Sequence, residues 1–296
     1  MAEIITSPSN PKVKQLLALQ QKSSARRERG LFVVEGRREL QHCIDAGFII
    51  DTIFVCPSLH GSQPLQPSGV AGPLPPTSSA GPSLLRSRGW LRAGEAAADS
   101  AAGQAKVFEV SEEVYRKISY REGTEGVMAE VKVPERKLEG LELPGNPLVM
   151  VLESVEKPGN LGAVLRSADA AGADAVLVCD PLTDLWNPNL IRASVGAVFT
   201  VPCVTCSSQE AIDWLKARGI RILTAQLQDS SLYYDCDMTV GTALVMGTEA
   251  TGLTPRWRQA ADAHIRIPML GALDSLNVSV SAAILLFEAV RQRQNG

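Results

Sequence analysis

The stretch that decides the predicted fold reads LVMVLE at 148–153, NLGAVLRSADAAG at 160–172 and AVLVC at 175–179. The first and third segments are short apolar runs, which are typical of buried strands. The segment between them has the apolar spacing of an amphipathic helix, and Gly172 ends it. A strand, a helix and a second strand in this order predict two parallel strands joined by a crossover helix.

The same alternation continues to the end of the chain. Further strands are predicted at 197–202, 221–226, 242–247 and 264–269, and further helices at 187–196, 208–219, 254–261 and 275–293. Apolar strands interleaved with helices predict an α/β domain whose parallel sheet is covered on both faces. Ligands of such sheets bind beyond the carboxyl ends of the strands, so the loops that follow the strands are the expected site of function.

The N-terminal part predicts a second, smaller α/β unit. A helix begins after Asn10 and is followed by a basic turn. Ser111 is the expected N-cap of a later helix. Strands are predicted at 31–36, 49–56, 106–110 and 126–134, with a helix at 37–47. The polar segment before residue 147 then divides the chain into a domain at 1–135, a linker at 136–146 and a domain at 147–296.

Residues 57–104 interrupt the smaller unit. Their composition is dominated by Pro, Gly, Ser and Ala, as in GSQPLQPSGVAGPLPPTSSAGPS at 61–83. Such a segment buries too little apolar surface to offset the entropy of ordering it. We therefore predict a disordered insertion between two strands, of which about residues 61–104 can be replaced by a short turn.

Composition sets the broad class of protein. The chain has 296 residues, of which 45% are hydrophobic, as in a globular protein. No apolar run reaches the roughly 18 to 20 residues that cross a bilayer, and MAEIITSPSNPKVK at the start lacks the apolar core of a secretory signal. We expect a cytoplasmic protein with no membrane partner. Cys203 and Cys206 form a lone CxxC without a second pair or a nearby histidine, so reduced thiols and no metal site are expected.

The net charge of −3 does not indicate nucleic-acid binding, but one segment is basic. Residues 10–40 contain eight Lys or Arg side chains and three Glu side chains. This local excess suits a phosphate backbone, with a solvated helix surface as the alternative. The candidate RNA-binding residues are Arg26, Arg27 and Arg29.

Three loops of the larger domain carry polar side chains suited to ligand binding. In PGNLGAVLRSA at 158–168, glycines lie close to Asn160, and Arg166 follows six residues later. A glycine-rich turn that opens a helix exposes backbone N–H groups to an anion. The segment lacks GxGxxG, so it is a weak candidate for a dinucleotide site.

The other two loops follow later strands. In VMGTEATGL at 245–253, a strand ends at Gly247 and Glu249 follows; the alternative role for Glu249 is to cap the next helix. In IPMLGALDSLNVSVSAA at 267–283, Ser275 and Asn277 begin a long apolar helix, and either side chain alone would be interpreted as a helix cap.

Together the three loops resemble, in order and spacing, the signature motifs of the SpoU-type (TrmH-like) branch of the SPOUT RNA 2′-O-ribose methyltransferases. The resemblance covers about residues 146–296, with motif one in NLGAVLRSADAAG, motif two in LVMGTEATGL and motif three in IPMLGALDSLNVSVSAAILLFEA. FVVEGRRELQHCIDAG also resembles the family's substrate-binding domain. The chain departs from the family where VEKPGN lacks a frequent aspartate, so Glu156 and Lys157 receive no role.

The resemblance implies a C-terminal domain with a deep trefoil knot, an exception to the rule that chains do not thread loops. It also implies S-adenosylmethionine as cofactor, an RNA substrate that is ribosomal or else transfer RNA, and a homodimer. The implied catalytic residues are Arg166, Asn160, Glu249, Ser275 and Asn277. The implied cofactor-binding residues are Met246, Gly247, Ile267, Met269 and Leu276.

The implied reaction needs an oxygen nucleophile in line with the methyl group and no metal. Because a guanidinium has a pKa above about 12, we expect Arg166 to bind the target phosphate and stabilise alkoxide charge rather than to accept the proton. Two other functions remain as alternatives: a non-catalytic RNA-binding protein with the same fold, and a nucleotide-binding oxidoreductase, which needs a GxGxxG that this chain lacks.

Overall fold

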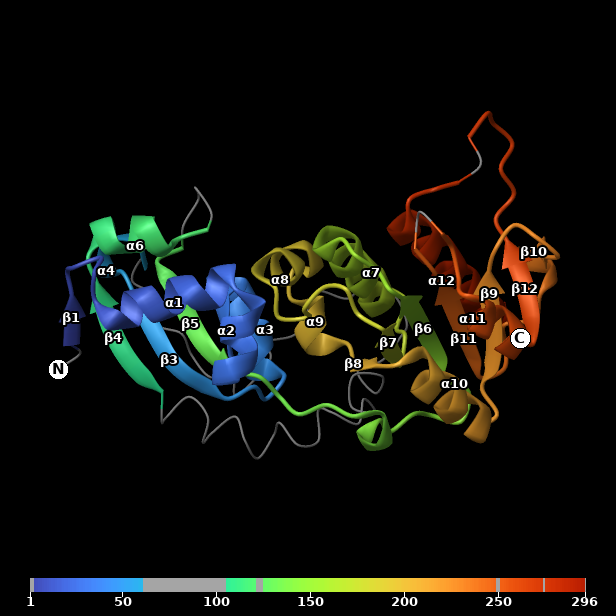
Figure 1. Ribbon diagram of the computed structural model, residues 1–296, viewed down its shortest axis with the longest axis horizontal. Coiled ribbons are helices and arrows are strands. Elements are labelled where there is room, and N and C mark those ends of the chain that lie inside the picture. Colours follow the sequence, from blue (N-terminus) through green and yellow to red (C-terminus); the bar gives the residue numbers. More distant parts are fainter. Residues whose placement is uncertain (1–2, 61–104, 121–124, 249–250, 274, 296) are drawn as a thin grey trace. The chain divides into compact units, whose positions relative to one another are not determined.

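The computed structural model describes residues 3–60, 105–120, 125–248, 251–273 and 275–295 (Figure 1). The chain forms two compact units. Unit 1 comprises Met1–Pro134 and Trp186–Arg192, and unit 2 comprises Glu135–Leu185 and Ala193–Gly296.

Unit 2 contains a seven-stranded sheet in the order β10-β12-β9-β11-β6-β7-β8. Every neighbouring pair in this sheet is parallel, as the alternation of strands and helices predicts. The strands are β6 Leu148–Glu153, β7 Ala175–Cys179, β8 Cys203–Cys206, β9 Arg221–Ala225, β10 Ser231–Leu232, β11 Thr242–Met246 and β12 Ala263–Arg266.

Every residue of β6, β7 and β11 is buried, because helices cover both faces of this sheet. Helices α7 and α12 pack against each other over β6 and β11, and α10 and α11 pack against each other over β9. The helices are α7 Pro158–Ala170, α9 Ala197–Thr200, α10 Ser208–Ala217, α11 Pro255–Ala260 and α12 Val278–Asn295, with short 3-10 turns at η2 Leu138–Gly140 and η3 Tyr233–Asp235. Most of α8, Pro188–Ser194, lies in the segment that belongs to unit 1.

The strand predicted at 197–202 is wrong. These residues begin the short helix α9, and the strand β8 comes later, at Cys203–Cys206. Gly196 turns the chain into α9 with φ 88°, and Val198 and Phe199 are buried. The β-branched and aromatic residues that suggested a strand therefore pack as one buried helical turn, a case in which tertiary burial overrides local propensity.

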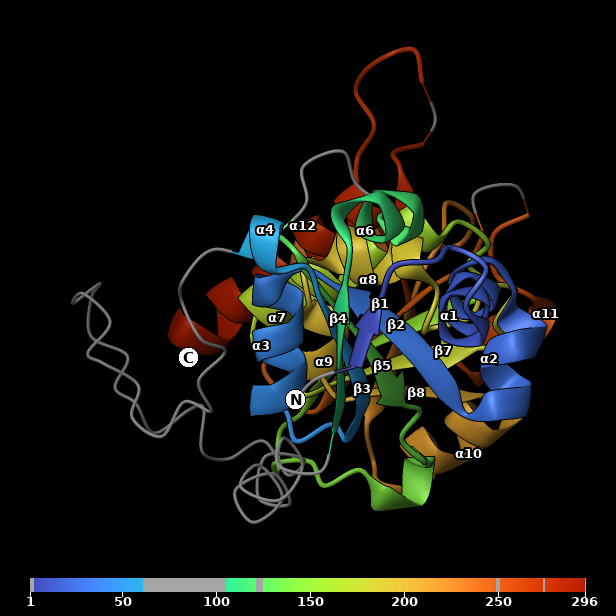
Figure 2. The same cartoon turned by 90° about the vertical axis from the view of Figure 1, so that its left-hand side faces the viewer.

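Unit 1 contains a five-stranded sheet in the order β1-β4-β3-β5-β2. Figure 2 shows α1 and α2 on one side of this sheet and α3 on the other. The elements are β1 Glu3–Ile5, α1 Pro11–Gln21, α2 Ser23–Arg29, β2 Leu31–Glu35, α3 Arg37–Asp45, β3 Ile50–Val55, α4 Pro57–His60, β4 Lys106–Val110, α6 Glu112–Ile118 and β5 Val127–Lys132. The predicted N-cap is confirmed, because the Ser111 side chain accepts a hydrogen bond from the Val114 amide.

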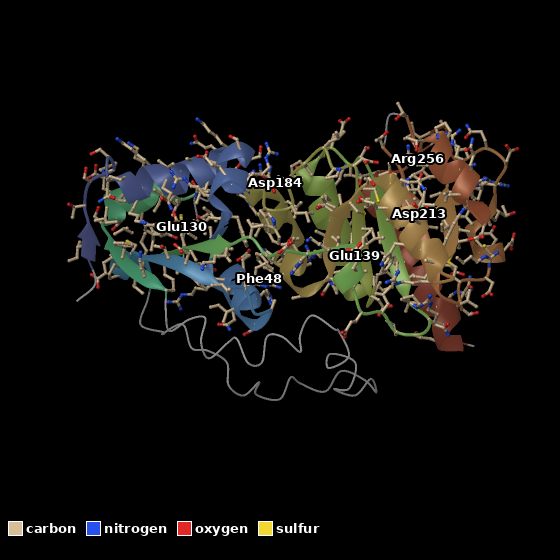
Figure 3. The ribbon with its side chains drawn as sticks, turned by 60° about the horizontal axis from the view of Figure 1, so that its bottom comes forward. Phe48, Glu130, Glu139, Asp184, Asp213 and Arg256 are labelled. Carbon is tan, nitrogen blue, oxygen red and sulfur yellow. The ribbon has the colours of Figure 1, made fainter. Side chains whose placement is uncertain are left out.

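Unit 1 also includes a segment from the later half of the chain. The Trp186 ring stacks on Phe32 with centroids 4.5 Å apart and meets Phe48 edge-on at 5.7 Å (Figure 3). Phe48 and Phe32 also meet edge-on. Aromatic contacts of this kind add to the free energy of burying the rings. The segment Trp186–Arg192 is therefore held by an apolar contact with the sheet of unit 1.

The strands on either side of the predicted insertion are parallel neighbours. Thr52 of β3 lies opposite Lys106 of β4. Parallel strands need a crossover of about a dozen residues, so the predicted replacement of the insertion by a short turn is wrong. Residues 57–60 form the helix α4, and the rest of the insertion, 61–104, lies outside the described residues.

Glu130 is a buried carboxyl in the interior strand β5 (Figure 3). Gln15 donates to its Oε2 at 2.9 Å, and its Oε1 has no hydrogen-bond partner among the described residues. Burial raises the pKa of Glu130 to about 7, a shift that the nearby positive charge of Lys12 only partly opposes. The protonated carboxyl is therefore the form that the folded unit favours.

We expect this carboxyl to make unit 1 less stable at alkaline pH. Because the folded pKa of about 7 lies above the ordinary value of 4.5, its contribution is full below pH 4.5 and lost as the pH rises through 7. Each unit of separation is worth about 1.4 kcal/mol. In urea unfolding between pH 5 and 8, Glu130→Gln should remove this part of the pH dependence, whereas Glu113→Gln, at an exposed site on α6, should keep it. An unchanged slope in Glu130→Gln contradicts the prediction.

Candidate functional site

A cavity of about 650 Å³ opens at the carboxyl ends of β9, β11 and β12. Its volume lies within the range of small-molecule sites in proteins. The loops after these strands and the start of α12 form its walls. The residues that line it include Gln226, Met246, Gly247, Thr248, Gly252, Leu253, Arg258, Arg266, Ile267, Met269, Ser275, Leu276, Asn277 and Val278.

The loop after β11 is folded tightly back on itself. The Thr248 amide donates to the Gly252 carbonyl at 3.2 Å, and the Gly252 amide donates to the Thr248 carbonyl at 3.0 Å. A Cβ atom at Gly247 would lie less than 3.0 Å from the backbone carbonyl of Gly252, a separation that real Cβ atoms do not reach. Only glycine fits at position 247 while this loop stays closed.

Glu153, at the end of β6, holds the far end of this loop. Its side chain is 2% exposed and accepts hydrogen bonds from the Thr254 amide at 2.8 Å and the Thr254 hydroxyl at 2.7 Å. The Ser208 hydroxyl lies 3.2 Å from the same carboxylate and accepts a hydrogen bond from the Trp257 indole. Satisfied polar networks of this kind fix the groups they join. Glu153 is not among the predicted site residues, although a carboxylate that ends an apolar strand was a signal for it.

Asn277 joins the loop after β12 to α7. Its Oδ1 accepts from the Ser279 amide at 2.9 Å and the Ser279 hydroxyl at 2.6 Å, so it caps the start of α12. Its Nδ2 donates to Asn160 Oδ1 at 3.2 Å. The helix cap that the sequence offered for Asn277 is therefore confirmed, and the same side chain also contacts motif one.

A second cavity of about 150 Å³ adjoins the first. Gly247, Thr248 and Val278 line both cavities. The other walls of the smaller cavity are Val155, Glu156, Lys157 and Asn160. A ligand in the larger cavity and a second reactant in the smaller one would thus meet beside Gly247.

The structure brings most of the predicted site residues together. Seven of them line the larger cavity: Met246, Gly247, Ile267, Met269, Ser275, Leu276 and Asn277. Asn160 lines the smaller one. Arg166 is exposed on α7 and is not among the residues that line either cavity. It lies six residues after Asn160, about 9 Å along the helix and on a different face. Glu249 lies outside the described residues.

Several polar side chains of the larger cavity were not predicted, among them Gln226, Arg258 and Arg266 outside the three motifs. Gln226 Oε1 is buried and has no hydrogen-bond partner among the described residues. Arg258 and Arg266 add positive charge. A buried acceptor without a partner costs free energy, so a ligand that donates a hydrogen bond to Gln226 would recover it. These residues lie outside the three motifs, and only the fold brings them to the cavity.

The predicted RNA-binding cluster needs one correction. Its residues form the helix α2 rather than a turn. Arg26 is 3% exposed, and its Nη1 donates to the Leu19 carbonyl at 2.6 Å and the Gln20 carbonyl at 3.2 Å. It therefore satisfies carbonyl groups at the end of α1 and is not available to a phosphate. Arg27 and Arg29 are exposed, and Arg29 Nη1 donates to Gln15 Oε1.

The cysteines are free thiols in the described part of the chain. Cys206 Sγ lies 3.8 Å from Cys179 Sγ rather than beside Cys203. Burial raises the pKa of Cys203 to about 12, so this thiol stays protonated. The described residues contain no group of three metal-binding side chains, and none of their helices has the length and apolar character to cross a bilayer.

Comparisons with known proteins agree with this geometry. Residues 147–287 match the SpoU rRNA Methylase family, and residues 10–73 match an MRM3-like substrate binding domain. A 23S rRNA (guanosine-2′-O-)-methyltransferase of Ralstonia nicotianae is 35% identical over 70% of this chain and 83% of its own length. A 23S rRNA uridine 2′-O-methyltransferase of Streptomyces viridochromogenes is 35% identical over 57% of this chain and 61% of its own length.

Solved structures of RNA methyltransferases resemble nearly the whole chain. The structure of an AdoMet-bound rRNA methyltransferase from Sinorhizobium meliloti covers 98% of both chains with a TM-score of 0.79 and 28% identity. The structure of an RNA 2′-O ribose methyltransferase covers 98% of this chain and 99% of its own, with a TM-score of 0.74 and 36% identity. The chain belongs to the SpoU rRNA methylase family.

Proposed function

We propose that the protein transfers the methyl group of S-adenosylmethionine to a ribose 2′-hydroxyl of ribosomal RNA. The observation that carries this proposal is the pair of adjoining cavities, bordered by all three motif loops and joined by the Asn277–Asn160 hydrogen bond. The relatives named for 23S rRNA support ribosomal rather than transfer RNA as the substrate. They methylate the ribose of different nucleosides, uridine and guanosine, so the target nucleoside is left open.

The larger cavity suits S-adenosylmethionine in size and in chemistry. Apolar side chains, among them Ile267 and Leu276, give the adenine an apolar wall. The missing side chain at Gly247 lets the loop after β11 close against it and form this part of the cavity wall. Gln226 Oε1, buried without a partner among the described residues, is an acceptor for a donor group of the cofactor. Met246 and Met269 complete the proposed cofactor-binding set.

The cofactor supplies an electrophilic methyl group, and the protein must place the ribose hydroxyl in line with it. We assign this positioning to Asn160, Ser275 and Asn277. Glu249, which lies outside the described residues, keeps the catalytic role that the resemblance implies. Transfer to the ribose oxygen would leave S-adenosylhomocysteine, and the hydroxyl proton would pass to solvent water. Arg166 lies outside both cavities, and we keep for it the role that the resemblance implies, which is to bind the phosphate of the target nucleotide and stabilise the negative charge that develops on the oxygen.

A homodimer is the proposed assembly. Val280, Ile284 and Phe287 follow the spacing of one helix face on α12, and Val280 and Phe287 are 47% and 48% exposed. A stripe of apolar residues at this spacing is suited to bury against a second copy of the chain. We also propose that the chain of unit 2 is knotted, as the family resemblance implies, and that the protein is located in the cytoplasm with its ribosomal substrate.

The test is methyl transfer with purified protein. Protein-free ribosomal RNA and transfer RNA are incubated with S-adenosylmethionine labelled in its methyl group, and the RNA is digested to nucleosides. We expect the label in a 2′-O-methylnucleoside from ribosomal RNA. Label on a base, or label only in transfer RNA, contradicts the proposal. RNA binding without any transfer favours a non-catalytic RNA-binding protein.

We propose that unit 1 holds the RNA through phosphate contacts made by Arg27 and Arg29. Both are exposed on α2, whereas Arg26 is buried. Replacing both exposed arginines with alanine should flatten the dependence of log affinity on log salt by roughly 0.7 to 0.9 for each phosphate that is no longer bound. Arg116→Ala is the control, because Arg116 is paired with Glu112 on α6. Filter binding at several salt concentrations measures the slope, and an unchanged slope in the double variant excludes these contacts.

A further inference from the structure

The charged residues that line the larger cavity are both arginines. Arg258 and Arg266 are among its walls, and no described carboxylate is. Arg266 already has a partner, because its Nη1 donates to the Ser230 hydroxyl at 3.4 Å. Within the described parts of the chain, no hydrogen bond or ion pair occupies the Arg258 guanidinium. A cation directed at a ligand cavity selects for an anionic group on the ligand.

The backbone position of Arg258 is fixed by two residues that precede it. Trp257, the preceding residue, is fully buried, and its indole donates to Ser208 at 3.0 Å. Thr254, just before the helix, is held by Glu153 through two hydrogen bonds. Arg258 Nη2 lies 3.9 Å from the Cβ position at Gly252, beside the closed loop after β11. The guanidinium therefore stands at the cavity wall before any ligand arrives, which lowers the cost of binding.

S-adenosylmethionine carries a sulfonium, an ammonium and a single anionic group, the carboxylate of its methionine part. An arginine attracts the carboxylate and repels the other two charges, and its planar fork matches the two oxygens. We propose that Arg258 binds the α-carboxylate of the cofactor and so selects ligands that carry an amino-acid group. This inference rests on the proposed function, because it assumes that the cavity holds this cofactor.

Arg256 provides a matched control on the same helix (Figure 3). It lies two residues before Arg258, about 200° away around the helix, and is exposed. It is not among the residues that line the cavity. Arg256→Ala removes the same charge from the same segment without removing a group from the cavity wall.

The experiment compares two ligands by titration calorimetry. S-adenosylhomocysteine has the carboxylate, and methylthioadenosine has the same adenosine thioether without the amino-acid part. Arg258→Ala should weaken S-adenosylhomocysteine binding by about tenfold, the effect of removing a charged hydrogen bond of about 1.4 kcal/mol. Methylthioadenosine should bind this variant as it binds the wild type. Arg256→Ala should bind both ligands normally, and Arg258→Lys should recover part of the affinity.

Three results would overturn the inference. If Arg258→Ala binds both ligands normally, no carboxylate contact exists. If it weakens both ligands equally, Arg258 supports the loop rather than the carboxylate. If Arg256→Ala weakens S-adenosylhomocysteine binding as much as Arg258→Ala does, the loss comes from the removed positive charge and not from a direct contact. A wild-type protein that binds neither ligand refutes the proposed function itself, a result distinct from these three.

Discussion

Replacing Arg166 with alanine should slow the methyl-transfer step by about 100-fold or more, the scale observed when one preorganised electrostatic group is removed from an active site. Arg166 is exposed on α7, the helix that also carries Asn160. Its charge acts mainly as negative charge develops on the ribose oxygen, so the effect should fall on the chemical step rather than on binding. Single-turnover methylation with saturating RNA and S-adenosylmethionine isolates that step.

Two comparisons make this prediction specific. Arg166→Lys should recover only part of the rate, because an ammonium cannot reproduce the planar fork of a guanidinium. S-adenosylhomocysteine should bind Arg166→Ala as it binds the wild type, because the cavity is lined by other residues. Near-normal single-turnover rates in Arg166→Ala would show that the active-site assignment is wrong, even though the family assignment would stand.

Adding one methyl group at Gly247 should cost about 100-fold in cofactor affinity, since overpacking of this kind costs about 1 to 3 kcal/mol. The new Cβ of Gly247→Ala would lie less than 3.0 Å from the backbone of Gly252, and backbone atoms cannot move aside as a flexible side chain can. The loop must open, which breaks the paired Thr248–Gly252 hydrogen bonds and distorts the cavity wall. Titration with S-adenosylhomocysteine measures the change in affinity.

Gly145→Ala is the matched control for this substitution. Nothing lies within 4 Å of a Cβ at that position, and Gly145 is in the segment before β6, away from both cavities. It should leave both the melting temperature and the affinity unchanged. If Gly247→Ala binds S-adenosylhomocysteine normally, the closed form of the loop after β11 is not the form that binds the cofactor.

The alternation of elements in unit 2 could be predicted because its strands are buried on both faces. LVMVLE and TALVM are continuous apolar runs, and each became a strand with every residue buried. Residues 197–202 failed this rule because Val198 and Phe199 bury equally well in a helical turn behind Gly196. The apolar residues themselves do not distinguish the two outcomes over so short a run.

The candidate site was predictable where glycines and caps mark it. Gly247 is required by the closed loop after β11, and Asn277 caps the start of α12. Both residues line the larger cavity. Glu153, Gln226 and Arg258 lie outside the three motifs, and only the fold places them in or beside the cavity. The prediction that Arg26 binds RNA rested on its charge alone and is wrong, because its guanidinium donates to the carbonyls at the end of α1.

The most direct test of the account is a nucleotide-resolution map of 2′-O-methyl groups in total RNA. Three otherwise identical strains are compared: one with the protein, one without it and one with Arg166→Ala. The account predicts that a ribose methyl group in ribosomal RNA is present in the first strain and absent or strongly reduced in the other two. Ribosomal maps that are identical in all three strains would contradict it.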